Sequence, residues 1–153
     1  MSKEEKTIEK LKSALYCRVS TEHEDQLTSY KAQMEYKNEQ FDIIQIYNEQ
    51  VSGKLLYKRK EQQKLLYDAG IDVSFHDKQP IFSISQRSPL FDIIIVANTS
   101  RFGRNIIEVK QMINALEKKK VSIYFDDLGK MSSDKDLSLT LDLLFLLDEN
   151  YSK

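Results

Sequence analysis

Short apolar runs alternate along the chain with longer stretches in which apolar residues recur at helical spacing. The runs predict strands at residues 15–19, 41–47, 91–97 and 121–125. The helical spacing predicts helices over residues 22–40, 59–69 and 103–120. Strands that alternate with helices in this way indicate an α/β fold with a mostly parallel sheet. The run at residues 91–97 is the most apolar, so we expect it to form the central strand, buried on both faces.

Two stretches leave alternatives open. Residues 71–90 contain both prolines and show no clear period, so they form either an irregular excursion or a small hairpin. Residues 137–147 are apolar almost all round a predicted helix. Such a helix is either fully buried in the core, or it packs one face on the core and another on a partner subunit.

Composition narrows the class of protein. The 153 residues fit one domain, with a polar lead-in of alternating Lys and Glu over residues 1–12. The net charge of −1 excludes a global basic field, so any contact with DNA must be local or lie outside this chain. The single cysteine, Cys17, allows no disulfide framework, and no apolar run is long enough to cross a membrane. We therefore expect a cytoplasmic protein.

The first predicted strand ends with candidate chemistry. Arg18 and Ser20 are two residues apart, so on a strand their side chains would face the same space. A serine after a strand is more often a helix cap or a loop residue. An arginine in an otherwise apolar strand, however, needs a charged partner or a polar site, because burying it alone is costly.

A second arginine group follows the predicted central strand. Arg101 and Arg104 are three residues apart, so they would share one face at the start of the next helix. Free backbone N–H groups there would complete an anion site, although ion pairs with carboxylates such as Glu108 are the simpler interpretation. If both strand ends meet at one edge of the sheet, a hydroxyl nucleophile lies beside guanidinium groups, which suits attack on a phosphodiester. Arg59, at the start of another helix, is a weaker candidate.

Other kinds of site find no support. The sequence has no nucleophile-elbow glycine pattern, no phosphate-cradling glycine loop and no zinc-ligand spacing. Three acidic residues, Asp126, Asp127 and Asp134, are better explained by a turn after a strand. We therefore expect neither a metal ion nor an organic cofactor.

At these residues the sequence resembles the serine recombinases, the resolvase/invertase family, and particularly the N-terminal catalytic domain of the large recombinases and integrases. The resemblance covers nearly the whole chain from about Leu15. It rests on four motifs: Tyr16-Cys17-Arg18-Val19-Ser20-Thr21, Ser29 with Gln33, Ser52-Gly53 followed by Arg59, and Ser100-Arg101-Phe102-Gly103-Arg104-Asn105. Three features depart from the family: many small members have Asp where Ser100 stands, a lysine often precedes this motif where the chain has Ala97 and Asn98, and residues 71–90 are longer than expected.

The resemblance implies a resolvase-like three-layer domain, with a mostly parallel central sheet of about four to five strands flanked by helices. It implies that Ser20 attacks a DNA phosphodiester, which leaves a 5′-phosphoseryl link and a free 3′-hydroxyl. Arg18, Arg59, Arg101 and Arg104 would hold the phosphate without a metal ion, while Gln33 and Ser100 would play supporting roles.

The resemblance also implies partners. A double-stranded DNA crossover site would be gripped mainly by C-terminal DNA-binding domains that residues 1–153 do not include. The protein would act as a dimer on each site and as a tetramer when two sites pair, in a phage-type integrase or a mobile-element transposase. Two other hypotheses stay open: a non-catalytic oligomerisation module of the same fold and, ranked lowest, a hydrolase of small phosphate esters.

Overall fold

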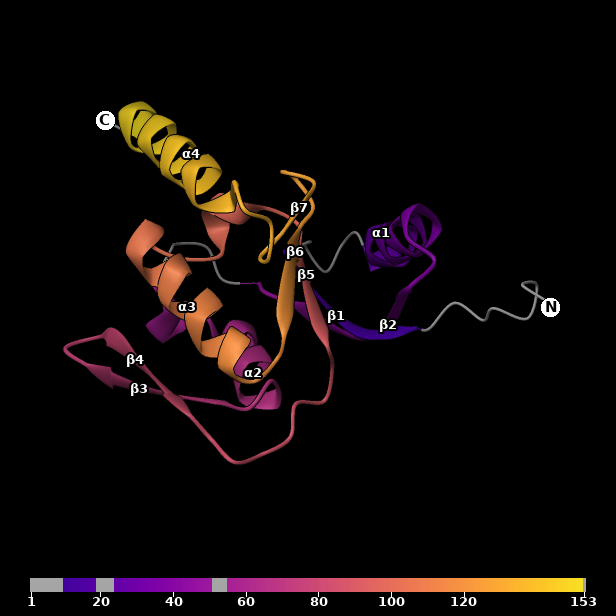
Figure 1. Cartoon of the computed structure of the whole chain (residues 1–153), viewed down its shortest axis with the longest axis horizontal. Helices are drawn as coiled ribbons and strands as arrows, with labels where there is room; N and C mark the ends of the chain where they lie inside the picture. Colours follow the sequence, from indigo (N-terminus) through magenta and orange to yellow (C-terminus); the bar gives the residue numbers. More distant parts are fainter. Residues whose placement is uncertain (1–9, 19–23, 51–54, 153) are drawn as a thin grey trace.

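The computed structural model describes residues 10–18, 24–50 and 55–152. Its centre is a five-stranded sheet in the order β2-β1-β5-β6-β7 (Figure 1). The first four of these strands run parallel and β7 runs antiparallel to β6, which confirms the expected mostly parallel α/β sheet. The strands are β1 (Leu11–Cys17), β2 (Phe41–Asn48), β5 (Ile93–Val96), β6 (Ser122–Phe125) and β7 (Lys130–Met131).

Helices cover both faces of the sheet and give the domain three layers. On one face, α1 (Glu24–Lys37) buries Met34 against a cluster that includes Leu15 and Ile95. A second cluster on the other face joins the sheet to α2 (Lys60–Asp68), α3 (Ile106–Lys118) and α4 (Leu137–Ser152). Figure 1 shows α1 on the opposite side of the sheet from α2 and α3.

Strand β5 occupies the centre of the sheet, as its sequence predicts. It pairs with β1 on one side and with β6 on the other, and all four of its residues are buried. Alternate residues serve the two cores, because Ile94 and Val96 belong to one cluster and Ile93 and Ile95 to the other. A strand in this position has no polar face, which explains its unbroken apolar run.

The stretch at residues 71–90 contains a hairpin, so the second of the two alternatives is right. Strands β3 (Ile71–His76) and β4 (Gln79–Ile84) pair antiparallel and form a sheet of their own. The two turn residues, Asp77 and Lys78, have φ of 52° and 66°, the left-handed geometry of a two-residue type I′ turn. Val73, Phe75 and Phe82 pack against the α2–α3 side of the core. Residues 71–76 do alternate between apolar and polar positions, but the pattern is lost in β4, which contains Pro80 and exposes Ile81 and Ile84.

Several boundaries differ from the sequence-based expectation. Strand β1 begins at Leu11, not at residue 15, because the polar pair Lys12 and Ser13 continues the ladder with β2, so the last two residues of the predicted lead-in belong to the strand. The acidic turn after β6 leads into β7, a fifth strand that the polar sequence concealed. Between β2 and α2, where the sequence predicts neither a strand nor a helix, a 3-10 turn, η3 (Leu56–Lys58), buries Leu56.

Helix α4 is not fully buried, so the first interpretation of its apolar sequence is wrong. Leu137, Leu141 and Phe145 pack into the core. Four leucines on the other faces are 53–62% exposed: Leu139, Leu143, Leu146 and Leu147. Whether a partner subunit covers them stays a prediction. Among the described residues, no helix is both long and apolar enough to cross a membrane.

Candidate active site

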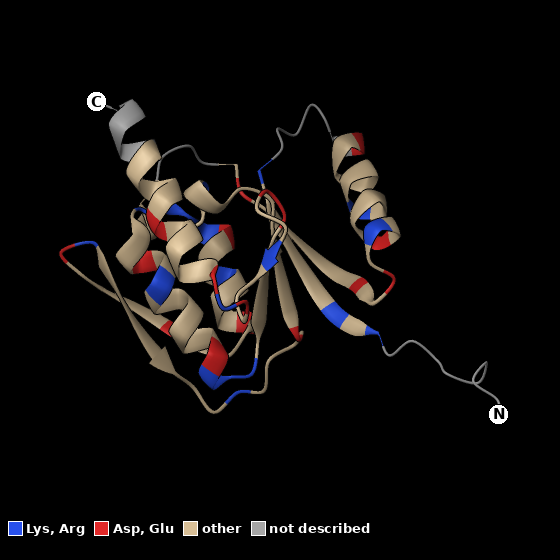
Figure 2. Ribbon diagram, turned by 45° about the horizontal axis from the view of Figure 1, so that its top comes forward, with Lys and Arg blue, Asp and Glu red and all other residues tan. Residues whose placement is uncertain are grey.

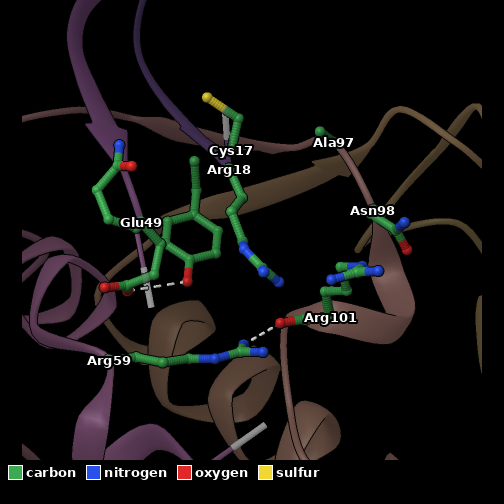
Figure 3. A pocket seen from close by; sticks show the side chains of 9 residues that line it. Cys17, Arg18, Glu49, Arg59, Ala97, Asn98 and Arg101 are labelled. Carbon is green, nitrogen blue, oxygen red and sulfur yellow. Dashed lines mark hydrogen bonds between the residues drawn. The ribbon is translucent and has the colours of Figure 1, made fainter. Parts of the chain in front are cut away.

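A cavity of about 560 Å³ opens at the edge of the sheet where β1, β2 and β5 end. The carboxyl ends of parallel strands are where α/β proteins commonly place their sites, because the chain leaves each strand there in a loop. Nine residues line the cavity, from five separate segments of the chain (Figure 3): Tyr16, Cys17, Arg18, Glu49, Gln50, Arg59, Ala97, Asn98 and Arg101. Three of the four predicted phosphate-binding arginines, Arg18, Arg59 and Arg101, therefore share one cavity.

Arg59 is buried and held in place. Only 4% of the residue is exposed, and it lies between η3 and the start of α2. Its Nη1 donates to Gln62 Oε1 at 3.2 Å and to the backbone oxygen of Arg101. The Gln62 side chain in turn donates to the backbone oxygen of Phe102. These bonds tie the start of α2 to the segment that carries Arg101.

Glu49 stabilises the start of α2 as well, and the sequence analysis did not identify it. The residue is 3% exposed and follows β2 directly. One of its carboxylate oxygens accepts from the Gln62 backbone N–H at 3.0 Å and from the Tyr16 hydroxyl at 3.1 Å; the other accepts from the Glu61 N–H at 3.3 Å. An anion at the first turn of a helix satisfies N–H groups that have no partner within the helix. The available signal was an acidic residue at the end of a strand adjacent to β1.

The Tyr16 hydroxyl belongs to this buried network. It lies within hydrogen-bond distance of both Glu49 Oε1 and Gln62 Oε1, at 3.1 and 3.2 Å, so its single proton can serve only one acceptor at a time. Burial, with Glu49 contributing, raises the pKa of Tyr16 well above its usual range, although Arg59 opposes this. Tyr16 therefore stays neutral and acts as a hydrogen-bond donor.

Arg18 and Arg101 approach the cavity from the other side, and both are exposed. Arg18 directly follows β1, and Arg101 ends the 3-10 turn η4 (Thr99–Arg101). Figure 3 shows the two side chains reaching into the same space above Arg59. The turn is fixed by Asp127, whose carboxylate accepts from the Thr99 backbone N–H at 3.0 Å and from the Thr99 hydroxyl at 2.5 Å. Asp127 is thus more than the simple turn residue that we expected.

Arg104 does not join the other three arginines. Helix α3 begins only at Ile106, because Asn105 caps it by accepting from the Glu108 N–H at 2.9 Å. Glu108 reaches back to the Arg104 N–H at 3.0 Å, which completes a variant of the capping box. The expectation that Arg101 and Arg104 share a helical face is therefore wrong. Arg104 is exposed, and its guanidinium donates to the side-chain oxygen of Gln79 in β4.

Burial perturbs two further groups near the cavity. The pKa of Glu108 is raised mainly by burial, against the attraction of Arg104 and Arg59. Burial likewise raises the pKa of the Cys17 thiol to about 11, so it is protonated near neutral pH. Cys17 therefore acts as a small buried residue at the end of β1.

Of the remaining predicted residues, some lie next to the main cavity and others lie outside the described residues. Gln33 lines a neighbouring hollow of about 450 Å³ together with Ser29, and this hollow shares Ala97 with the main cavity. Ser100 is half-buried and its hydroxyl donates to Asn98 Oδ1 at 3.0 Å. The predicted nucleophile Ser20 lies outside the described residues, as do Thr21, Ser52 and Gly53. Within the described part of the chain, no three His, Cys, Asp or Glu side chains are grouped so as to hold a metal ion.

Comparison with known proteins places the chain by its fold. No protein-family model matches the sequence, and no curated protein matches it either. Solved structures do match, and they show that the chain has the fold of serine recombinase catalytic domains. The resemblance read from the motifs is thereby confirmed at the level of the fold.

Three of these structures show how far the likeness extends. The N-terminal catalytic domain of TP901-1 integrase is 20% identical, with a TM-score of 0.55, over 92% of this chain and 96% of that one. A resolvase family site-specific recombinase from Streptococcus pneumoniae is 22% identical, with a TM-score of 0.58, over 93% and 90%. The C-terminal catalytic domain of ISC1926 TnpA, an IS607-like serine recombinase, is 16% identical, with a TM-score of 0.51, over 86% and 78%.

Proposed function

We propose that this chain is the catalytic domain of a site-specific serine recombinase. The observation that carries the proposal is the convergence of Arg18, Arg59 and Arg101 on one cavity at the sheet edge. Ser20 follows Arg18 by two residues, so the chain enters this cavity just before the nucleophile. The fold shared with serine recombinase catalytic domains supports the same conclusion.

In the proposed reaction, Ser20 Oγ loses its proton and attacks the phosphorus of a DNA phosphodiester. The bond from phosphorus to the 3′-oxygen breaks, the 3′-oxygen takes up a proton, and the 5′-phosphate stays on the serine. Attack by the 3′-hydroxyl of the exchanged strand reverses these steps and releases Ser20. Because the covalent link conserves the phosphodiester, the strands can be resealed without an external energy source.

The arginines supply the positive charge that this reaction needs. Guanidinium groups bind phosphate oxygens in bidentate fashion and stabilise the extra negative charge of the pentacoordinate state. Arg59 is already fixed, whereas Arg18 and Arg101 are exposed and free to close on the phosphate. Arg104 would join them after releasing Gln79, and Gln33 and Ser100 would support the site from its margins. The proposed chemistry uses neither a metal ion nor a cofactor.

The partners in this proposal are DNA and further copies of the chain. The exposed leucines of α4 form an apolar surface of the kind that marks an interface, which supports dimers on one site and tetramers on paired sites. Basic and acidic residues are interspersed over the helices (Figure 2), so the main grip on a crossover site is assigned to DNA-binding regions outside residues 1–153. A recombinase of this kind acts in the cytoplasm.

The test looks for the covalent intermediate. The chain is fused to a sequence-specific DNA-binding domain and mixed with duplexes that carry two copies of that domain's site around a randomised core. Reactions are stopped with detergent, digested with nuclease and protease, and analysed by mass spectrometry. We expect the peptide that contains Ser20 to carry a nucleotide 5′-phosphate, and the adduct to be absent from Ser20→Ala.

Arg101→Lys is a second test variant, because it keeps the positive charge and loses the bidentate hydrogen bonding of the guanidinium group. It should retain DNA binding and lose at least about tenfold in adduct formation, which corresponds to about 1.4 kcal/mol. Site-bound, paired complexes that form no Ser20 adduct would contradict the proposal. They would favour the non-catalytic oligomerisation module, for which the exposed leucines of α4 are the supporting observation.

A further inference from the structure

A cationic and aromatic surface lies beside the cavity, formed by segments that are distant in sequence. We call it the Tyr57 surface and define it as Tyr57, Lys58, Lys60 and Lys78, all of which are exposed. Tyr57 and Lys58 belong to η3, Lys60 opens α2, and Lys78 lies in the turn of the β3–β4 hairpin. The residues of the proposed reaction do not include any of the four.

Tyr57 organises this surface. The ammonium groups of Lys60 and Lys78 lie 5.9 and 6.0 Å from the centre of its ring, one from each of two separate elements. The ring itself packs edge-on against Phe75 of β3 at 5.3 Å. Phe75 in turn packs against the main core, so the surface is built on a fixed base. The left-handed turn at Asp77 and Lys78 brings the hairpin's lysine to this position.

The charge of this surface is not neutralised within the described part of the chain. Four other lysines pair with carboxylates: Lys31 with Glu35, Lys37 with Asp126, Lys110 with Asp142, and Lys130 with Asp136. Lys58, Lys60 and Lys78 make no such pair with a described residue. The nearest acidic positions in sequence are Glu61 and Asp77, and Asp77 is itself 3.6 Å from His76. Because the positive charges of Lys60 and Lys78 lie around one ring and repel each other, an anionic ligand would be bound favourably there.

The position of the surface identifies the anion. Lys58 and Lys60 flank Arg59 in sequence, and Arg59 lines the cavity, so the surface borders the site of the proposed phosphodiester cleavage. The same hairpin contacts the loop before α3 through Gln79 and Arg104. A duplex whose scissile phosphate enters the cavity presents further phosphates along its backbone on either side. Lysines contact such phosphates as point charges and read no sequence.

We propose that the Tyr57 surface binds the phosphate backbone of duplex DNA next to the cleaved phosphodiester. This inference rests on the proposed function, and it assigns a role to the hairpin at residues 71–90. Lys58, Lys60 and Lys78 hold successive phosphates, while Tyr57 keeps the last two lysines in register. The surface contributes affinity and orientation of the duplex, not the chemistry of cleavage.

The experiment measures binding of the chain to a fluorescein-labelled duplex of arbitrary sequence, by fluorescence anisotropy at increasing salt from low ionic strength. Each lost phosphate contact lowers the slope of log affinity against log salt by about 0.9. Lys60→Ala/Lys78→Ala should therefore reduce the slope by about 1.8. Between about 50 and 200 mM salt, the unaltered chain should lose about twelvefold more affinity than this variant.

Two control variants separate charge from structure. Lys60→Arg/Lys78→Arg keeps both charges and should keep the original slope. Lys118→Ala/Lys135→Ala removes two exposed lysines outside the surface and should also keep it. An unchanged slope in Lys60→Ala/Lys78→Ala would overturn the inference, and so would an unaltered chain without salt-dependent binding. The proposed function fails separately, through a missing Ser20 adduct while the change in slope is as expected.

Discussion

The two sides of the candidate site are built in opposite ways. On the inner side, defined as Tyr16, Glu49, Arg59 and Gln62, every residue is buried and the four are joined by hydrogen bonds. On the outer side, Arg18 and Arg101 are exposed at the ends of a strand and a short turn. The same cavity thus combines one guanidinium held by the fold with two that reach it from solvent.

This difference separates two requirements of a phosphate site. A fixed donor lowers the reorganisation needed when negative charge develops, and burial strengthens its interaction with that charge. Exposed arginines can admit a large substrate such as a duplex and close on it afterwards. We therefore expect substitutions on the inner side to affect stability and those on the outer side to affect mainly activity.

The largest expected effect follows from removing Glu49. Glu49→Ala leaves the backbone N–H groups of Glu61 and Gln62 without their acceptor and removes the carboxylate bonded to Tyr16. We expect the free energy of unfolding in urea to fall by about 3 kcal/mol. On the outer side, Arg101→Ala should change it by less than about 0.5 kcal/mol. Equal losses in the two variants would abolish the distinction between the sides.

A smaller effect tests whether the outer side has an anchor of its own. Asp127→Ala removes the acceptor for the N–H and the hydroxyl of Thr99, and Thr99 is fully buried. By analogy with the loss of a helix cap, the cost should be about 1 kcal/mol. The matched control is Asp142→Ala, which breaks only the exposed pair with Lys110 and should cost less than about 0.5 kcal/mol. A loss no larger than that of the control would show that η4 keeps its form without Asp127.

The same contrast explains how much the sequence could predict. Strand β5 was predictable because a strand buried on both faces contains only apolar residues, and Arg18 because it directly follows an apolar strand. Glu49 was not predictable, because its role depends on the pairing of β2 with β1 and on the contact between its carboxylate and the first turn of α2. Arg104 was misplaced because Asn105, a capping residue, delays the start of α3. The hairpin was not decided because only its first strand alternates, whereas β4 contains Pro80 and exposes Ile81 and Ile84.

The smallest expected effect concerns the carboxyl group of Glu108. Burial raises the pKa of Glu108, so the folded state binds its proton more tightly than the unfolded state does. Its contribution to stability is therefore present at low pH and is lost as the pH rises through the raised pKa. Glu108→Gln keeps an acceptor for the Arg104 N–H and cannot ionise, so its stability relative to the unaltered chain should increase between about pH 4 and pH 7.

Asp136 provides a control of opposite sign, because the hydrogen bond from Lys130 lowers its pKa, and its contribution is lost as the pH falls. Asp136→Asn should accordingly lose stability relative to the unaltered chain as the pH rises over the acid range. Urea midpoints are measured across this range for both variants and the unaltered chain. Parallel curves for Glu108→Gln and the unaltered chain would mean that burial does not penalise the Glu108 charge.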